Sequence, residues 1–158
     1  MTETAESGPA TGMVELIELP PKRAAVVRFS GRTDELPKLM GHAFATTSEA
    51  INAAGARFAG HPFARYFSFG EPIEAVAGFP FEGGEPAAEG VEIVTLPSGL
   101  AAMTRHVGPY ATIGEAWARG TAWIQNHGYA TSGPGWECYL TGPEDPGPPI
   151  TEVFWPLA

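Results

Sequence analysis

The chain contains an internal repeat, and this repeat limits the folds that it can adopt more strictly than any other feature. Residues 14–31 (VELIELPPKRAAVVRFSG) align without gaps on residues 91–108 (VEIVTLPSGLAAMTRHVG). The identical pairs are Val14 and Val91, Glu15 and Glu92, Leu19 and Leu96, Pro20 and Pro97, Ala24 and Ala101, Ala25 and Ala102, Arg28 and Arg105, and Gly31 and Gly108. A duplication predicts two related halves, neither of which could bury its apolar surface alone.

Each copy of the repeat is followed by a pattern of apolar residues at helical spacing. The first pattern predicts a helix that begins at Thr33 or Asp34 and ends near Gly55. The second predicts a helix from about Thr112 to a stop at Gly128. Its apolar face carries Ile113, Trp117, Gly120 and Ile124.

After each helix come two runs that are typical of β-strands. These runs are residues 63–68, 73–79, 136–140 and 150–155. The repeated unit is therefore strand, helix, strand, strand. We expect an α+β fold in which the two halves fuse their antiparallel sheets around a shared core.

The composition indicates one globular domain. We expect residues 1–12 to form a disordered tail, and residues 13–158 to form a single domain of two repeats, at about 13–82 and 90–158. No stretch is apolar enough to cross a membrane, and the first residues lack the features of a signal peptide. The single cysteine fits a reducing compartment, so we expect a cytoplasmic protein.

The net charge of −9 argues against direct binding to nucleic acid. Phosphate neutralisation needs clustered Lys and Arg, and the nine basic residues are scattered among eighteen acids. The four histidines, His42, His61, His106 and His127, do not fall at metal-ligand spacings, and no phosphate-binding glycine motif is present. We therefore expect no metal and no cofactor.

The stretch WECYL at residues 136–140 places a carboxylate within a strand-like run. Because alternate strand residues point to opposite faces, Glu137 and Tyr139 share one face, and so do Glu152 and Phe154 in the last run. If the two strands are antiparallel neighbours, we expect both acids and both aromatic rings to form one patch. The opposite parity carries the residues expected to pack on the helices, namely Trp136, Cys138, Leu140, Val153 and Trp155.

Two interpretations of this patch remain open from the residues alone. It could be the solvated face of a half-buried sheet, or it could line a cavity. Tyr66 and Gly78, at the corresponding positions of the first half, would add an uncharged wall and favour the cavity. Aromatic walls with one or two carboxylates suit a flat, lipophilic and often cationic molecule. Glu137 could then serve as a counter-ion or as a general base.

The order of these motifs resembles the GyrI-like small-molecule-binding domains. The resemblance rests on HVGPY at 106–110, on WECYL at 136–140 and on TEVFWPL at 151–157, and it covers residues 14–157. The same module forms the effector-binding part of AraC-type and MerR-type regulators, including the multidrug-sensing regulator BmrR. The resemblance implies two strand-helix-strand-strand modules about a pseudo-twofold axis, with a ligand groove between them.

The resemblance also assigns roles to individual positions. In the multidrug regulator, acids on the last two strands lie among aromatic rings and accept cationic lipophilic drugs, and Glu137 and Glu152 stand at the matching positions. Phe154 replaces a tyrosine of that pattern. The ligand-binding residues implied are Tyr66, Tyr110, Glu137, Tyr139, Glu152 and Phe154. For Tyr110 a role in helix packing remains an equal alternative, and for His106 we favour a turn-stabilising role over a place in the groove.

Three classes of function follow from the resemblance. The leading one is binding of a lipophilic small molecule, for sequestration or sensing, with a protein partner or a second copy of the chain. The second is a hydrolase that opens strained cyclopropane rings of DNA-alkylating natural products, with Glu137 as general base and Tyr139 or Tyr110 as its hydrogen-bond partner. The third is a protein inhibitor that protects DNA gyrase. The DNA-binding domain of the regulators is absent from this chain, so we do not expect it to act as a regulator by itself.

Overall fold

The computed structural model describes residues 12–142 and 144–158 of the chain. These residues form an α+β fold that divides into two compact units. Of the described residues, 12–20, 98–142 and 144–158 belong to unit 1, and Pro21–Pro97 form unit 2. Each unit holds one α-helix and one antiparallel sheet, which agrees with the α+β class predicted from the repeat.

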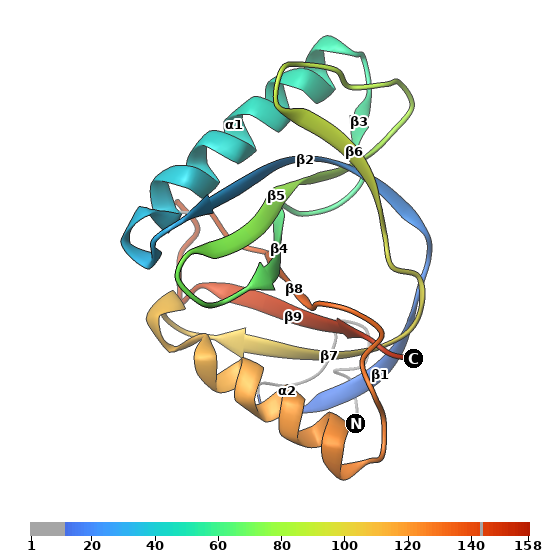
Figure 1. Ribbon diagram of the computed structural model, residues 1–158, viewed down its shortest axis with the longest axis vertical. Helices are drawn as coiled ribbons and strands as arrows, with labels where there is room; N and C mark the ends of the chain where they lie inside the picture. The colour runs from blue at the N-terminus through green and yellow to red at the C-terminus, as the bar shows by residue number, and fades with distance from the viewer. Residues whose placement is uncertain (1–11, 143) are drawn as a thin grey trace. The chain divides into compact units, whose positions relative to one another are not determined.

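Unit 1 contains the C-terminal half of the chain together with the first strand. Its elements are β1 (Val14–Leu19), β7 (Gly99–Val107), the 3-10 turn η3 (Tyr110–Thr112), α2 (Gly114–Asn126), β8 (Trp136–Tyr139) and β9 (Ile150–Pro156). The strands pair in the order β1-β7-β9-β8, with every pair antiparallel. In Figure 1, α2 runs alongside β7. The core beneath it is made of Ala102, Ala116, Ile124, Val153, Trp155 and Leu157.

Unit 2 repeats this plan with the N-terminal half of the chain. Its elements are β2 (Lys22–Gly31), the 3-10 turn η2 (Thr33–Glu35), α1 (Leu36–Ala53), β3 (Arg57–Phe58), β4 (Phe63–Ser68), β5 (Ile73–Glu82) and β6 (Val91–Leu96). The strands pair in the order β4-β5-β2-β6, and the short β3 pairs with β5. Figure 1 shows α1 next to β2, and their shared core includes Ala25, Ile51 and Phe81.

The expectation that each copy of the repeat forms one strand was wrong. Each copy forms two strands, because Pro20-Pro21 in the first copy and Pro97 in the second interrupt the ladder of backbone donors. The two strands of a copy also belong to different units. β1 is paired with β7 in unit 1, and β6 is paired with β2 in unit 2. Each unit therefore contains one edge strand that comes from the other copy of the repeat.

The helix ends agree closely with the sequence patterns. The first helical segment opens with η2 at Thr33, and α1 ends at Ala53, two residues before Gly55 with φ of +70°. α2 ends at Asn126, ahead of Gly128 with φ of +78°. Glycine adopts this left-handed conformation without a steric penalty, which explains the helix stops. Neither helix in the described part of the chain is long and apolar enough to span a lipid bilayer.

Candidate functional site

The register of β8 against β9 decides which side chains share a face of the unit 1 sheet. Glu137 is opposite Val153, and Cys138 is opposite Glu152. Directly opposed residues of antiparallel strands point to the same face. Glu137 therefore lies on the face that is covered by α2, and Glu152 lies on the other face. The prediction of a single patch containing both acids was wrong. Such a patch needs Glu137 opposite Glu152, and the observed register differs from that pairing by one residue.

On the α2 face, Glu137 is held by three aromatic side chains. Its Oε1 accepts hydrogen bonds from the hydroxyls of Tyr110, at 2.5 Å, and Tyr139, at 2.7 Å. Its Oε2 accepts a hydrogen bond from the indole Nε1 of Trp117, at 2.5 Å. The Glu137 side chain is only 2% exposed, and burial of a charge is tolerated where hydrogen bonds replace those of water. We call these four residues the Glu137 cluster.

Tyr110 reaches this carboxylate because of the turn between β7 and α2. The amide of Gly108 donates to the carbonyl of Pro149 at 2.9 Å, and Pro109 begins the 3-10 turn that contains Tyr110. Below the turn, His106 Nε2 lies 3.1 Å from the carbonyl oxygen of Pro109 and 3.0 Å from the hydroxyl of Thr112. His106 thus stabilises the turn, which is the role favoured from the sequence.

Trp117 reaches the carboxylate from the first turns of α2. Its ring packs edge-to-face on Trp155, with ring centroids 5.4 Å apart. At Gly135, just before β8, a Cβ atom would lie 2.6 Å from the carbonyl oxygen of Phe154 and 3.0 Å from the ring of Trp117. Gly120 in turn makes room for Trp155, whose ring would come within 2.0 Å of an added Cβ. Two glycines therefore permit the packing that aims the indole N–H at Glu137.

The cluster combines a buried carboxylate with an accessible aromatic side. Tyr110 is 41% exposed and Tyr139 is half-buried, with their hydroxyl oxygens 3.4 Å apart. The ring centroids of the two tyrosines are 5.9 Å apart. A cation or a hydrogen-bond donor that meets these rings would be attracted both by the π-faces and by the carboxylate behind them. The hydroxyls can also pass a proton to or from Oε1.

Glu152 and Phe154, predicted for the same site, have other partners. On the face opposite α2, Glu152 Oε2 forms an ion pair with Arg105 Nη2 at 2.6 Å, and both side chains are less than one-fifth exposed. Phe154 stacks on Trp136, with ring centroids 5.5 Å apart and an interplanar angle of 13°. The placement of Trp136 against α2 was therefore also wrong. The structure brings together Glu137, Tyr139 and Tyr110, and it places Glu152 and Phe154 on the opposite side of the sheet.

The remaining predicted residue, Tyr66, lies on β4 in unit 2. It is 4% exposed and stacks on Phe69, with ring centroids 5.0 Å apart. Across residues 12–142 and 144–158, His, Cys, Asp and Glu side chains do not gather in a group of three that could hold a metal ion.

Trp117 is the member of the cluster that sequence reasoning did not assign to the site. Its helical spacing with Ile113 and Ile124 indicated a core residue, and that part of the prediction is correct, since the ring packs against the unit 1 core. The spacing does not predict the direction in which the indole N–H points. An indole N–H needs a hydrogen-bond acceptor when it is buried, and in the structure Glu137 provides one.

Comparison with protein families decides the classification of the fold. The family model described as the GyrI-like small molecule binding domain matches residues 13–158. The chain belongs to the GyrI-like family. Its family resemblance, inferred from the HVGPY, WECYL and TEVFWPL motifs, is thereby confirmed. No curated protein sequence gives a significant match to this GyrI-like chain.

Solved structures similar to this GyrI-like chain include regulators and a hydrolase. EcmrR in a complex with DNA is 18% identical with a TM-score of 0.78, and the match covers 92% of this chain but only 57% of that one. A hydrolase from Listeria innocua is 14% identical with a TM-score of 0.67, covering 98% and 96% of the two chains. SAV2435 bound to tetraphenylphosphonium is 14% identical with a TM-score of 0.61, covering 92% and 94%. At these identities the likeness shows a shared fold.

Proposed function

We propose that this GyrI-like chain binds a lipophilic molecule with aromatic or cationic character, and that the Glu137 cluster is its binding site. The observation that carries the proposal is the buried carboxylate of Glu137 held by three aromatic side chains. Tyr110 and Tyr139 form the accessible side of this cluster. A ligand would stack on these rings, and a positive charge on it would be stabilised by the carboxylate behind them.

The size of the expected effect follows from the charge of Glu137. A cation about 4 Å from a carboxylate gains about 4 kcal/mol at the effective dielectric of a partly buried site. Removal of that charge should therefore weaken binding of a cation by at least about tenfold, which corresponds to 1.4 kcal/mol. Glu137→Gln suits this purpose because the amide keeps the shape of the side chain, while the tyrosine hydroxyls can accept from its NH₂ group.

The test is calorimetric titration with tetraphenylphosphonium, the ligand of the structurally similar SAV2435. Wild-type protein, Glu137→Gln and Glu115→Gln would be compared, since Glu115 is an exposed carboxylate of α2 in the same unit. We expect Glu137→Gln alone to lose affinity. Equal affinities for all three proteins would show that the carboxylate of the cluster does not hold the cation.

A second candidate function is hydrolysis of a strained, lipophilic cyclopropane. It is favoured by the two tyrosine hydroxyls that share Oε1 of Glu137, because this places proton donors and a proton acceptor in hydrogen-bond contact. A structurally similar protein is a hydrolase from Listeria innocua, although at 14% identity it supports only the fold.

The reaction can be balanced with the residues of the cluster. A water oxygen forms a bond to a ring carbon while Glu137 accepts one proton from that water. The ring carbon–carbon bond breaks, and its electron pair is taken up by a conjugated acceptor of the substrate. Tyr110 or Tyr139 donates a proton to the opened product and recovers one from Glu137. The net change is the addition of one water to the substrate.

Binding and hydrolysis are separated by a mass balance. A small amount of protein would be incubated with an excess of a cyclopropane-bearing alkylator, and products would be followed by mass spectrometry. Gain of one water in many-fold excess over protein, lost in Glu137→Gln, supports the hydrolase. Recovery of the intact compound, with a stoichiometric fraction bound to the protein, leaves a binding domain.

A further inference from the structure

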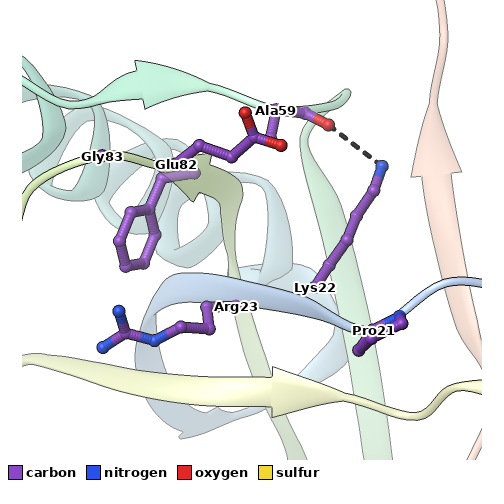
Figure 2. A pocket seen from close by; sticks show the side chains of 7 residues that line it. Pro21, Lys22, Arg23, Ala59, Glu82 and Gly83 are labelled. Carbon is purple, nitrogen blue, oxygen red and sulfur yellow. Dashed lines mark hydrogen bonds between the residues drawn. The ribbon is translucent and has the colours of Figure 1, made fainter.

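Unit 2 contains a hollow of about 270 Å³ at the start of β2, far along the chain from the residues of the Glu137 cluster. Its lining includes Pro21, Lys22, Arg23, Ala59, Phe81 and Glu82. Figure 2 shows the Lys22 side chain extending along one side of this space towards Ala59, while Arg23 extends towards the other side. The volume lies just below the usual range for ligand pockets, so only a small molecule would fit.

The Lys22 ammonium is anchored by the protein backbone and not by an acid. Nζ donates a hydrogen bond to the carbonyl oxygen of Ala59 at 3.0 Å. Among the described residues Lys22 forms no ion pair with a carboxylate, although its side chain is half-buried. An ammonium group has three donors, and the bond to Ala59 uses one of them, on a lysine that lines the hollow. A half-buried charge normally has a counter-ion, and no carboxylate in the described part of the chain pairs with Lys22.

The other charges around the hollow are already paired. Both terminal nitrogens of Arg23 donate to the carboxylate of Glu85, at 2.8 and 3.0 Å, and these hydrogen bonds lower the pKa of the Glu85 carboxyl. Glu82 forms an ion pair with Arg57 at 3.3 Å. These two pairs cancel, so the hollow has one net positive charge, on Lys22. This is notable in a chain whose formal net charge is −9.

The walls provide a surface for an apolar group next to that charge. The guanidinium of Arg23 covers the ring of Phe81, with its central carbon 5.2 Å from the ring centroid. The Phe81 ring covers one face of the guanidinium and Glu85 binds its edge, while the Arg23 side chain is 48% exposed, so the other face can stack on a ligand. The Pro21 ring adds a second apolar surface at the same opening.

We propose that this hollow is a binding site for a small monocarboxylate with a flat apolar body, whose carboxylate group is held by Lys22. A single negative charge matches the single unpaired positive charge. A dianion such as inorganic phosphate fits less well, because the carboxylate of Glu82 lines the same space and would repel the second charge. The apolar body would lie between Pro21 and the Arg23 plane.

The test uses the rarity of lysine in the chain, which has only Lys22 and Lys38. In protein labelled with ¹⁵N-lysine, the two side-chain ammonium groups give two NMR signals, assigned with Lys22→Gln and Lys38→Gln. Benzoate would be titrated as the probe, with benzamide as a matched probe without charge and inorganic phosphate as the dianion, at constant ionic strength. Lys38 lies on α1 and serves as the internal reference.

We expect benzoate to shift the Lys22 signal saturably, with a dissociation constant in the millimolar range, and to leave the Lys38 signal in place. In Lys22→Gln, the backbone amide of Gly83 at the rim of the hollow reports binding instead, and affinity should fall at least tenfold. Lys38→Gln should bind as the wild type does. The amide spectrum of each variant also shows whether it is folded.

The proposal is overturned if benzoate moves both lysine signals equally, if benzamide binds as well as benzoate, or if Lys22→Gln retains wild-type affinity. A saturable response to phosphate without a response to benzoate would overturn the choice of a monocarboxylate. None of these outcomes depends on the Glu137 cluster, so the two sites are tested separately.

Discussion

Replacement of Trp117 by Phe is the sharpest test of the hydrogen bonds that hold Glu137. The change removes the indole N–H that lies 2.5 Å from Oε2 and keeps an aromatic ring at the same place. A hydrogen bond to a charged group contributes about 1.5–3 kcal/mol, whereas one between neutral groups contributes about 0.5–1.5 kcal/mol. The loss of unfolding free energy caused by Trp117→Phe should therefore depend on whether position 137 carries a charge.

The double-mutant cycle of Trp117→Phe and Glu137→Gln isolates this dependence. In both backgrounds the smaller ring loses the same packing against Trp155, so the packing loss cancels. The coupling free energy that remains is the contribution of the hydrogen bond to a charged Glu137 minus its contribution to a neutral Gln at the same position. It should be about 1–1.5 kcal/mol. In a chain of this length that corresponds to a difference of about 2–6 °C in melting temperature.

The assay is equilibrium unfolding in urea, with the midpoint and slope measured for the four proteins of the cycle. Trp123→Phe is the matched control, because Trp123 lies on the same helix and stacks on His127 and Tyr129, away from Glu137. The loss of unfolding free energy caused by Trp123→Phe should be the same with Glu or Gln at position 137. A coupling energy between Trp117 and Glu137 below about 0.5 kcal/mol would refute the hydrogen-bond argument, since independent sites are additive to that level.

Three further perturbations test other parts of the structure. Gly120→Ala should destabilise the fold by about 1–3 kcal/mol, seen as a lower urea midpoint, because the new Cβ would lie 2.0 Å from a buried indole ring; a raised midpoint would contradict that packing. Arg105→Gln should lower the melting temperature more than the double change Arg105→Gln and Glu152→Gln, because the single change leaves a largely buried carboxylate unpaired; a double variant that melts lower than the single one would count against this. Tyr110→Phe removes one donor from Glu137 and, if the cluster is catalytic, should lower turnover while leaving binding of tetraphenylphosphonium within about threefold; unchanged turnover would exclude Tyr110 as a proton donor.

The two helices and the strands β4, β5, β8 and β9 could be predicted from local sequence patterns, whereas each copy of the repeat was predicted as one strand and forms two. Helix ends depend on residues such as Gly55 and Gly128 that act on their immediate neighbours, and these predictions are confirmed. The exchange of β1 and β6 between the units was not predicted. Pro20-Pro21 and Pro97 signal where the ladder breaks, but the partner of a strand is set by packing distant in sequence.

The site was predicted only in part. As with the strand partners, the parts that were missed depend on contacts between segments distant in sequence. Glu137 with Tyr139 follows from strand parity within one strand, which local sequence determines. The relation of Glu137 to Glu152 depends on the connection between β8 and β9, where one residue more or less in the register reverses the face. Trp117 comes from a helix, and no pattern along the chain records that its N–H meets a carboxylate on β8.

The central claim, that a ligand binds at the Glu137 cluster, is tested most directly by ¹⁹F NMR of protein labelled with 5-fluorotryptophan. The chain has four tryptophans, so the spectrum contains four signals, each assigned by a Trp→Phe variant. On titration with tetraphenylphosphonium we predict a saturable shift of the Trp117 signal, no shift of the Trp123 signal, and loss of the response in Glu137→Gln. Binding that leaves the Trp117 signal unmoved would contradict the claim and place the ligand elsewhere.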